Sequence, residues 1–178
     1  MSPFAVGYLF GQLITLLAFL TPAFLFLRAQ QMVLTLVRPE NRRMDPGLVW
    51  LQLIPLLNWV WIFIVVRRIA DSLAKQFAAL QSDSILGIVD EQAIKDFGKK
   101  PTYRIGLAYC ILIACLPLSV ILFNIIGNPA TAPDNPTFVI WIGLTAFLLI
   151  LASIVCWIIY WVQLVQYKNK LKQALALG

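Results

Sequence analysis

Residues 41–73 read NRRMDPGLVWLQLIPLLNWVWIFIVVRRIADSL, and this stretch decides the fold. A charged turn, an uncharged segment and an amphipathic pattern follow one another in it without a spacer. The 19 uncharged residues 48–66 would form a helix of about 28 Å, close to the roughly 30 Å hydrocarbon core of a bilayer. Pro55 interrupts this segment because it lacks an N–H and disfavours helical angles at the residue before it. The stretch therefore predicts a membrane segment that is either kinked at Pro55 or re-entrant.

The composition of the chain indicates a membrane protein. Hydrophobic residues make up 61% of its 178 residues and charged residues 12%, and the mean hydropathy is +0.84. A soluble domain of this size cannot bury so much apolar surface in one core. We therefore predict an all-α fold, a polytopic membrane helix bundle forming a single domain over residues 1–178. Its four predicted apolar segments are residues 4–27, 48–66, 103–126 and 138–165.

The chain between the second and third apolar segments is more polar. Residues 67–80 combine apolar positions at helical spacing with a charged opposite side, which predicts a cytoplasmic amphipathic helix on the bilayer surface. Residues 81–102 form a polar connection. The first apolar segment has no Lys or Arg before it, so we expect a retained helix rather than a cleaved signal peptide.

Basic side chains of the amphipathic helix and the polar connection are predicted to lie near anionic lipid headgroups. Each such contact contributes up to about 1 kcal/mol and weakens in high salt. The alternative is a basic face that is simply solvated. The predicted headgroup residues are Arg67, Arg68, Lys75, Lys99 and Lys100.

Pro55 and Asn58 form the predicted helix break. A backbone opened at Pro55 within a membrane must find hydrogen-bond partners inside the protein. We expect Asn58 to supply one, by capping a helix that starts near Trp59 or by reaching a facing helix. A polar path that joins Asn58 to Gln52 is less favoured, because six residues separate them by about 120° around an unbroken helix.

Small residues at intervals of four predict two helix-packing faces, where backbones approach closely. We expect these contacts within the protein rather than between copies. One face lies in the first apolar segment and the other in the third: Gly7, Gly11 and Thr15, and Gly106, Cys110 and Ala114.

Aromatic residues gather near the ends of the second and fourth apolar segments. Such residues are typical of the boundary between membrane and water, so we interpret them as interface anchors and packing residues. The alternative for the first three is stacking on a pigment, quinone or sterol-like ring. The predicted interface aromatics are Trp50, Trp59, Trp61, Trp157, Tyr160 and Trp161.

The distribution of Lys and Arg leaves two topologies open. Residues 28–43 hold four of the 14 basic residues, residues 67–104 hold seven, and the C-terminal tail holds three. If residues 48–66 span the membrane, the first group lies outside, against the preference of basic residues for the cytoplasm. If residues 48–66 re-enter, all 14 are cytoplasmic and the N-terminus is outside. The C-terminus is cytoplasmic in both.

Residue types that the chain lacks exclude several functions. It contains no His, and its three Cys have no metal-ligand or redox-pair spacing, so we predict no metal site and no cofactor. None of the four apolar segments contains an Asp or Glu, and Arg104 at the start of the third is their one charged residue, which argues against proton or ion coupling by a buried carboxylate. Nucleophilic catalysis by Ser or Cys would lack a His base. We therefore predict no catalytic residues and no enzymatic activity.

Several motifs resemble those of a family of small bacterial multi-span membrane proteins that has no assigned chemistry. They are RMDPGLVWLQLIPLLNWVW at residues 43–61, IADSL at 69–73, GLAYCIL at 106–112 and CWIIYW at 156–161. The family's motif is Met-x-Pro-Gly-x-Val-Trp-Leu-x-x-Ile-Pro-Leu-x-Asn, and the resemblance covers residues 41–167. Leu57 departs from it, since an aromatic residue is expected there. The resemblance implies about four helices in the bacterial inner membrane and supplies no catalytic residue.

Two function classes remain after these exclusions. The first is a non-catalytic accessory or structural subunit that packs against or stabilises a larger membrane complex. The second is a small oligomeric transporter or pore, which predicts a cavity lined by Gln52, Asn58, Asn124 or Gln163. The expected partners are the lipid bilayer and other membrane subunits or further copies of the chain, and no nucleic acid.

Overall fold

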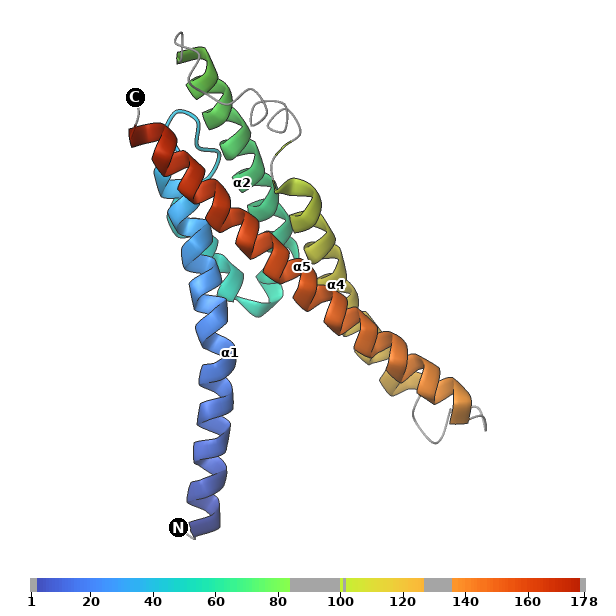
Figure 1. The fold of residues 1–178 in the computed structure, drawn as a ribbon. Coiled ribbons are helices and arrows are strands. Elements are labelled where there is room, and N and C mark those ends of the chain that lie inside the picture. Colours follow the sequence, from blue (N-terminus) through green and yellow to red (C-terminus); the bar gives the residue numbers. More distant parts are fainter. Residues whose placement is uncertain (1–2, 84–99, 101, 127–135, 177–178) are drawn as a thin grey trace.

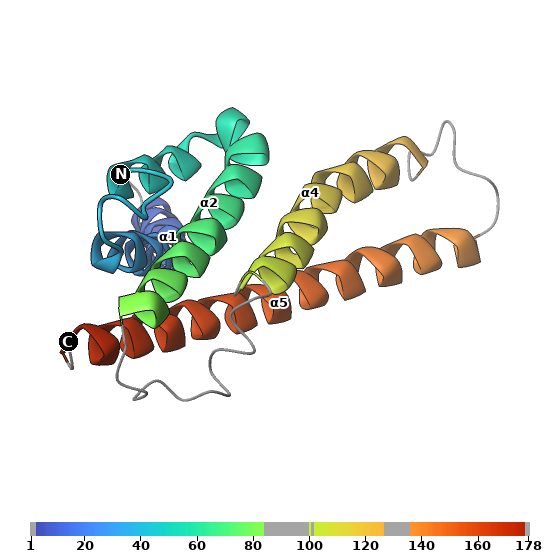
Figure 2. The same ribbon diagram turned by 90° about the horizontal axis from the view of Figure 1, so that it is seen from above.

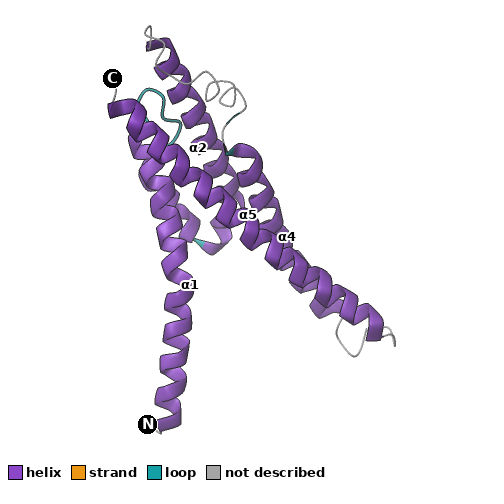
Figure 3. Ribbon diagram, viewed as in Figure 1, coloured by secondary structure: helices purple, strands orange, loops and turns teal. Residues whose placement is uncertain are grey.

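The computed structural model describes residues 3–83, 100, 102–126 and 136–176. These residues form helices and no strand (Figure 3), which confirms the all-α prediction. Four of the described helices begin at a proline, in agreement with the preference of proline for the first helical position. The helices are α1 (Pro3–Leu36), the 3-10 helix η1 (Pro46–Leu53), α2 (Pro55–Asp83), α4 (Tyr103–Ile126) and α5 (Pro136–Ala176).

The long helices diverge from a common packed region (Figure 1). α4 and α5 run antiparallel and form the most extensive helix pair, while the C-terminal half of α1 packs against the C-terminal half of α5. The N-terminal half of α1 points away from the α4–α5 pair. Seen from above, η1 and α2 fill the space beside α1 and α5 in the packed region (Figure 2).

The chain reverses direction at Ile54 and Pro55. Ile54 has extended angles, φ −83° and ψ 110°, and Pro55 begins α2 directly after it. The indole N–H of Trp61 donates to the Leu48 carbonyl at 2.8 Å, which ties the two arms together close to the reversal. Residues 48–66 therefore form no continuous helix: the break at Pro55 is observed, and the segment folds back on itself. We call residues 46–83 the hairpin and residues 53–57 its tip.

The turn at residues 37–45 is fixed by the far end of α2. The backbone N–H groups of Arg38 and Arg43 donate to Gln76 Oε1 and Ser72 Oγ, each at 2.9 Å. Both acceptor side chains are fully buried. Pairing with α2 thus runs antiparallel from the turn into the hairpin, from residues 38 and 76 to residues 48 and 61.

The amphipathic pattern of residues 67–80 belongs to α2 and not to a separate surface helix. Its apolar face is covered by the bundle: Ile69 and Leu73 are completely buried. The prediction that this face lies on lipid is therefore wrong. An apolar helical stripe shows that a face must be buried, but it does not distinguish burial in protein from burial in a bilayer.

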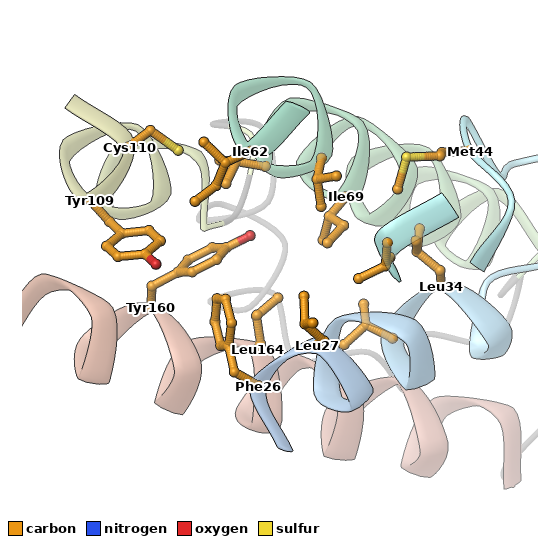
Figure 4. Close-up of a cluster of buried hydrophobic side chains, with 14 of the residues drawn as sticks. Phe26, Leu27, Leu34, Met44, Ile62, Ile69, Tyr109, Cys110, Tyr160 and Leu164 are labelled. Carbon is orange, nitrogen blue, oxygen red and sulfur yellow. The ribbon is translucent and has the colours of Figure 1, made fainter. Parts of the chain in front are cut away.

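The core joins the five described helices around three aromatic side chains (Figure 4). Tyr160 of α5 is completely buried, and its ring stacks on Tyr109 of α4 with centroids 6.4 Å apart. Phe26 of α1 meets the Tyr160 ring edge to face at 5.8 Å. Gly106 of α4 lies against Val66 and Tyr160 so closely that no side chain fits between them.

Charge is confined to one end of the described molecule. The charged residues that the structure describes lie in five places. These are the end of α1 after Leu27, the turn at residues 37–45, the part of α2 after Val66, residues 100 and 104 at the start of α4, and the part of α5 after Tyr167. These segments lie together in the upper part of Figure 1. The turn and the C-terminal end of α5 therefore share one end of the molecule.

Two helical stretches are long and apolar enough to cross a membrane: Phe10–Leu36 and Gly143–Ala176. Only 12% and 17% of their most apolar windows are buried, so most of this apolar surface faces outward. Tyr103–Ser119 of α4 is apolar but shorter. The structure thus fits a membrane protein, with two such stretches among the residues that it describes.

The turn at residues 37–45 and the C-terminal end of α5 lie at the same end of the molecule, and this arrangement can be tested by cysteine labelling. In a variant without native Cys, a cysteine introduced at Asn41 is expected to be protected from a membrane-impermeant thiol reagent on intact cells. The reason is that Asn41 lies beside Gln76 of α2, at the basic end of the molecule, and basic ends stay in the cytoplasm.

A cysteine at Ala132 serves as the positive control for this labelling. It lies outside the described residues, in the sequence between the end of α4 and the start of α5, and these two helix ends have no charged residue among the described residues. It should be labelled in the same cells. Labelling at Asn41 on intact cells would contradict the re-entrant topology.

Candidate functional site beneath the hairpin

The most unusual local feature of the structure is a groove beneath the tip of the hairpin, between α1 and α5. Its volume is about 460 Å³. Ten of its lining residues are apolar or aromatic and two, Gln52 and Asn58, carry amides. The apolar and aromatic lining comes from all the long helices and the tip: Ala18, Pro22, Ala23, Phe26, Leu27, Leu53, Ile62, Tyr109, Ile154 and Trp157.

Buried amides attach η1 to α1, and the end of η1 that is held in this way lines one side of the groove. Gln52 Nε2 donates to Gln30 Oε1 at 2.7 Å and to the Val49 carbonyl at 3.1 Å. Gln30 and Gln52 are both buried, where a hydrogen bond has little competition from water. On the neighbouring turn, the indole N–H of Trp50 donates to Gln31 Oε1 at 3.1 Å. A 3-10 helix whose own hydrogen bonds are weak is thereby fixed to a long α-helix.

Asn58 does not cap α2, so that prediction is wrong. The helix already begins at Pro55, and the Asn58 N–H donates to the Ile54 carbonyl at 2.8 Å as part of the first turn. The side-chain oxygen of Asn58 is buried and has no hydrogen-bond partner among the described residues. Because proline is itself favoured at the first helical position, the break needs no Asn cap. Asn58 instead presents an unpaired acceptor at the groove.

Because Gln52 has a buried hydrogen-bond partner and Asn58 Oδ1 has none, replacing each of them should affect the melting temperature differently. Asn58→Leu removes no hydrogen bond seen in the structure, so the melting temperature in detergent should stay unchanged or rise. Gln52→Leu leaves the Gln30 amide buried without its partner, which should cost about 1–3 kcal/mol and lower the melting temperature. Thermal unfolding followed by circular dichroism compares the two. A lower melting temperature for Asn58→Leu with none for Gln52→Leu would contradict these roles.

Only part of the predicted small-residue packing occurs within the chain. Gly106 makes the tight contact already described, and Cys110 beside it is completely buried. Ala114 is half-buried. In α1, however, a Cβ on Gly11 would meet no atom within 4 Å, and Thr15 is exposed. The expected contact of this α1 face with another part of the chain is therefore not seen, and the surroundings of Gly7 lie outside the described residues.

The predicted interface aromatics divide into exposed and interior residues. Trp59 is half exposed at the hairpin, whereas Tyr160 is completely buried, so its assignment to the membrane rim is wrong. Trp157 and Trp161 are half-buried and meet Phe26 edge to face. An aromatic cluster near a helix end looks the same in sequence whether it faces headgroups or a neighbouring helix. Trp50 and Trp61 are likewise half-buried, with the hydrogen bonds described above.

The predicted headgroup cations are at the charged end, but they differ in their surroundings. Arg67 and Lys75 are exposed. Arg68 Nη1 donates to the Arg43 carbonyl at 2.9 Å, and Lys100 forms an ion pair with Asp71 at 2.9 Å. Lys99 lies outside the described residues.

Sequence reasoning missed two contributors to these sites. Gln30 is the buried partner of Gln52, although it stands among polar neighbours in the sequence. Arg43 is brought next to Arg68 by the chain reversal. Neither pairing has a local sequence signal, because each joins residues more than 20 positions apart.

The groove offers hydrogen bonding through two amides and apolar contact through its other lining residues. The described residues contain no group of three His, Cys, Asp or Glu side chains that could hold a metal ion. No protein-family model, curated protein or solved structure in the three comparisons matches the chain. The resemblance to the family with the Pro-Gly and Ile-Pro-Leu motif therefore stays a prediction.

Proposed function

We propose that the protein is a non-catalytic subunit of the bacterial inner membrane that packs against the membrane helices of a larger complex. The observation that carries the proposal is the groove beneath the hairpin, an apolar space with one unpaired hydrogen-bond acceptor, Asn58 Oδ1. In this proposal a helix of a partner subunit, with a side-chain donor at the level of Asn58, occupies the groove. The C-terminus is cytoplasmic.

The distribution of charge supports a membrane position for the groove. The uncharged part of α1 before Arg28 is about 37 Å long, and that of α4 after Arg104 is about 33 Å, each enough to cross roughly 30 Å of hydrocarbon. From Arg67 down to Leu56 at the tip, α2 covers about 16 Å. The hairpin thus enters to about the middle of the bilayer, with α1, α4 and α5 crossing it.

The surroundings of Asn58 favour a protein partner over lipid chains alone. A buried amide oxygen without a donor costs about 1–3 kcal/mol, and hydrocarbon chains offer no donor. Membrane helices associate through close packing and through single polar side chains. The exposed small-residue face of α1 at Gly11 and Thr15 offers a second surface for the same partner.

The same groove also supports a second candidate function, which is transport. That alternative predicted a cavity lined by Gln52 and Asn58, and both line the groove, whereas Asn124 and Gln163 do not. A transporter or pore would work as an oligomer of this chain alone. An accessory subunit would carry a different protein at fixed stoichiometry.

Purification of the full-length chain from its native membrane, followed by mass spectrometry, tests the proposal. We expect one foreign membrane protein at fixed stoichiometry. Ala18→Trp fills the groove from α1 and should lower the yield of this partner about tenfold or more, as should Asn58→Leu to a smaller extent. Ala152→Trp, at an exposed position of α5 that does not line the groove, is the matched control.

Three outcomes would contradict the proposal. A homo-oligomer without any foreign subunit, together with solute flux in liposomes, favours the transport alternative. A monomer without partners rejects both functions. Equal loss of the partner from the Ala18→Trp and Ala152→Trp variants rejects the groove as the contact.

A further inference from the structure

The outer face of α2 changes from apolar to charged over a few residues. Leu56 and Val60 are 93% and 63% exposed, and Ile64 continues the same stripe one turn later. Arg67 and Asp71 follow at the next turns. This stripe lies opposite the face that carries Ile62 and the groove, so it is independent of the proposed partner contact. It marks the level at which α2 would leave hydrocarbon for the headgroup region.

The chain reversal adds a third arginine at this level. Arg43 lies in the turn, where its N–H donates to Ser72 Oγ at 2.9 Å and its carbonyl accepts from Arg68 Nη1 at 2.9 Å. These bonds use the backbone of Arg43 and leave its guanidinium outside them. The result is a hollow of about 410 Å³ lined by Arg43, Ile64, Arg67, Arg68 and Asp71.

Positive charge exceeds negative charge in this hollow. Asp71 is its one carboxylate, and Lys100 holds that carboxylate at 2.9 Å, closer than Arg67 at 3.9 Å. The hollow is therefore lined by three arginines and a single carboxylate, and that carboxylate already has a cation. Guanidinium groups present paired N–H donors whose geometry matches two oxygens of a phosphate. An anion with several oxygens would complete the hollow.

We propose that Arg43, Arg67 and Arg68 bind a phosphate group, supplied by an anionic phospholipid whose acyl chain lies along Leu56, Val60 and Ile64. The stripe from Ile64 down to Leu56 is about 12 Å long, most of one leaflet's hydrocarbon depth. A soluble phosphate would use the arginines alone. A phospholipid uses the arginines and the apolar stripe together, and Ile64 joins the stripe to the arginines in the lining of the hollow.

Native mass spectrometry of the full-length chain tests this site, in detergent with equal amounts of phosphatidylglycerol and phosphatidylcholine. The variant is Arg43→Gln with Arg67→Gln, because neither guanidinium takes part in the hydrogen bonds that fix the turn. We expect preferential retention of phosphatidylglycerol by the wild type and about tenfold less in this variant. The control is Lys170→Gln with Lys172→Gln, two exposed cations of α5 at the same charged end, which should stay within about twofold of the wild type.

Melting temperatures distinguish a folding defect from a loss of lipid binding, and a phospholipid from soluble phosphate as the bound anion. Without added lipid, the arginine variant should melt as the wild type does. Phosphatidylglycerol should raise the melting temperature of the wild type and not that of the variant. If inorganic phosphate raises it equally and displaces the lipid, the site binds soluble phosphate and the lipid assignment is overturned. Equal losses in the arginine and lysine variants, or equal retention of both lipids by the wild type, would overturn the site itself.

Discussion

Replacing Gly106 with alanine is expected to destabilise the bundle by about 1–3 kcal/mol. A Cβ at this position would lie 2.5 Å from Val66 Cγ1 and 2.9 Å from Tyr160 Cε2. Neither neighbour moves easily, because the valine side chain is restricted by its branched Cβ and the tyrosine ring is completely buried. The added methyl must therefore push α4 away from α2 and α5. The melting temperature of the purified protein in detergent, followed by circular dichroism, measures the effect.

Gly143→Ala is the matched control for this substitution. Gly143 also lies within a long helix, but a Cβ there would meet no atom within 4 Å. Alanine should raise stability by up to about 1 kcal/mol through its higher helix propensity. If Gly106→Ala melts at or above the temperature of Gly143→Ala, the close approach of the three helices at Gly106 is not present in solution.

Tyr160→Ala is expected to cost about 3–5 kcal/mol, the largest loss from a single side chain in this protein. The ring is completely buried and touches Phe26 of α1 and Tyr109 of α4. Truncation would leave a cavity at the point where α1, α2, α4 and α5 meet. In detergent the variant should melt far below the wild type.

Tyr160→Phe separates the ring from its hydroxyl. The hydroxyl is buried and has no partner of hydrogen-bond geometry in the described part of the chain, although the Gln30 side chain lies close to it. Its removal should therefore change stability by less than about 1 kcal/mol. Trp141→Ala, at a 65% exposed aromatic of the same helix, should also have little effect in detergent. A large loss in Tyr160→Phe would show that the hydroxyl is paired, and a small loss in Tyr160→Ala would contradict the packed core.

The helical fold and the break at Pro55 could be predicted from local residues. Long uncharged stretches indicate helices, and a proline, which lacks an N–H, favours a helix break or a helix start. Pro22 and Pro117, by contrast, lie inside α1 and α4, which continue through them. The bounds of α4 coincide with the predicted third segment at residues 103–126. By contrast, α2 continues from Pro55 through residue 67, because the gain of charge at Arg67 changes the surroundings of a helix without ending it.

The roles of single side chains were harder to predict. Asn58 after a proline has the spacing of a cap, yet Pro55 starts the helix without one. Tyr160 has the neighbours of an interface residue, but the close approach of α4 at Gly106 encloses it. In each case the outcome depends on a segment distant in sequence, and no local pattern contains that information.

The sequence by itself determined that the chain is helical and apolar, that its charges cluster in a few segments, and that its second segment breaks at Pro55. Only the tertiary structure decided that this segment folds back, that Gln30 pairs with Gln52, and that Arg43 joins Arg67 and Arg68. The physical reason is that composition and periodicity are properties of neighbouring residues. The direction of a chain after a break is set by the contacts that its two arms make, and here these include hydrogen bonds between residues 13 to 38 positions apart.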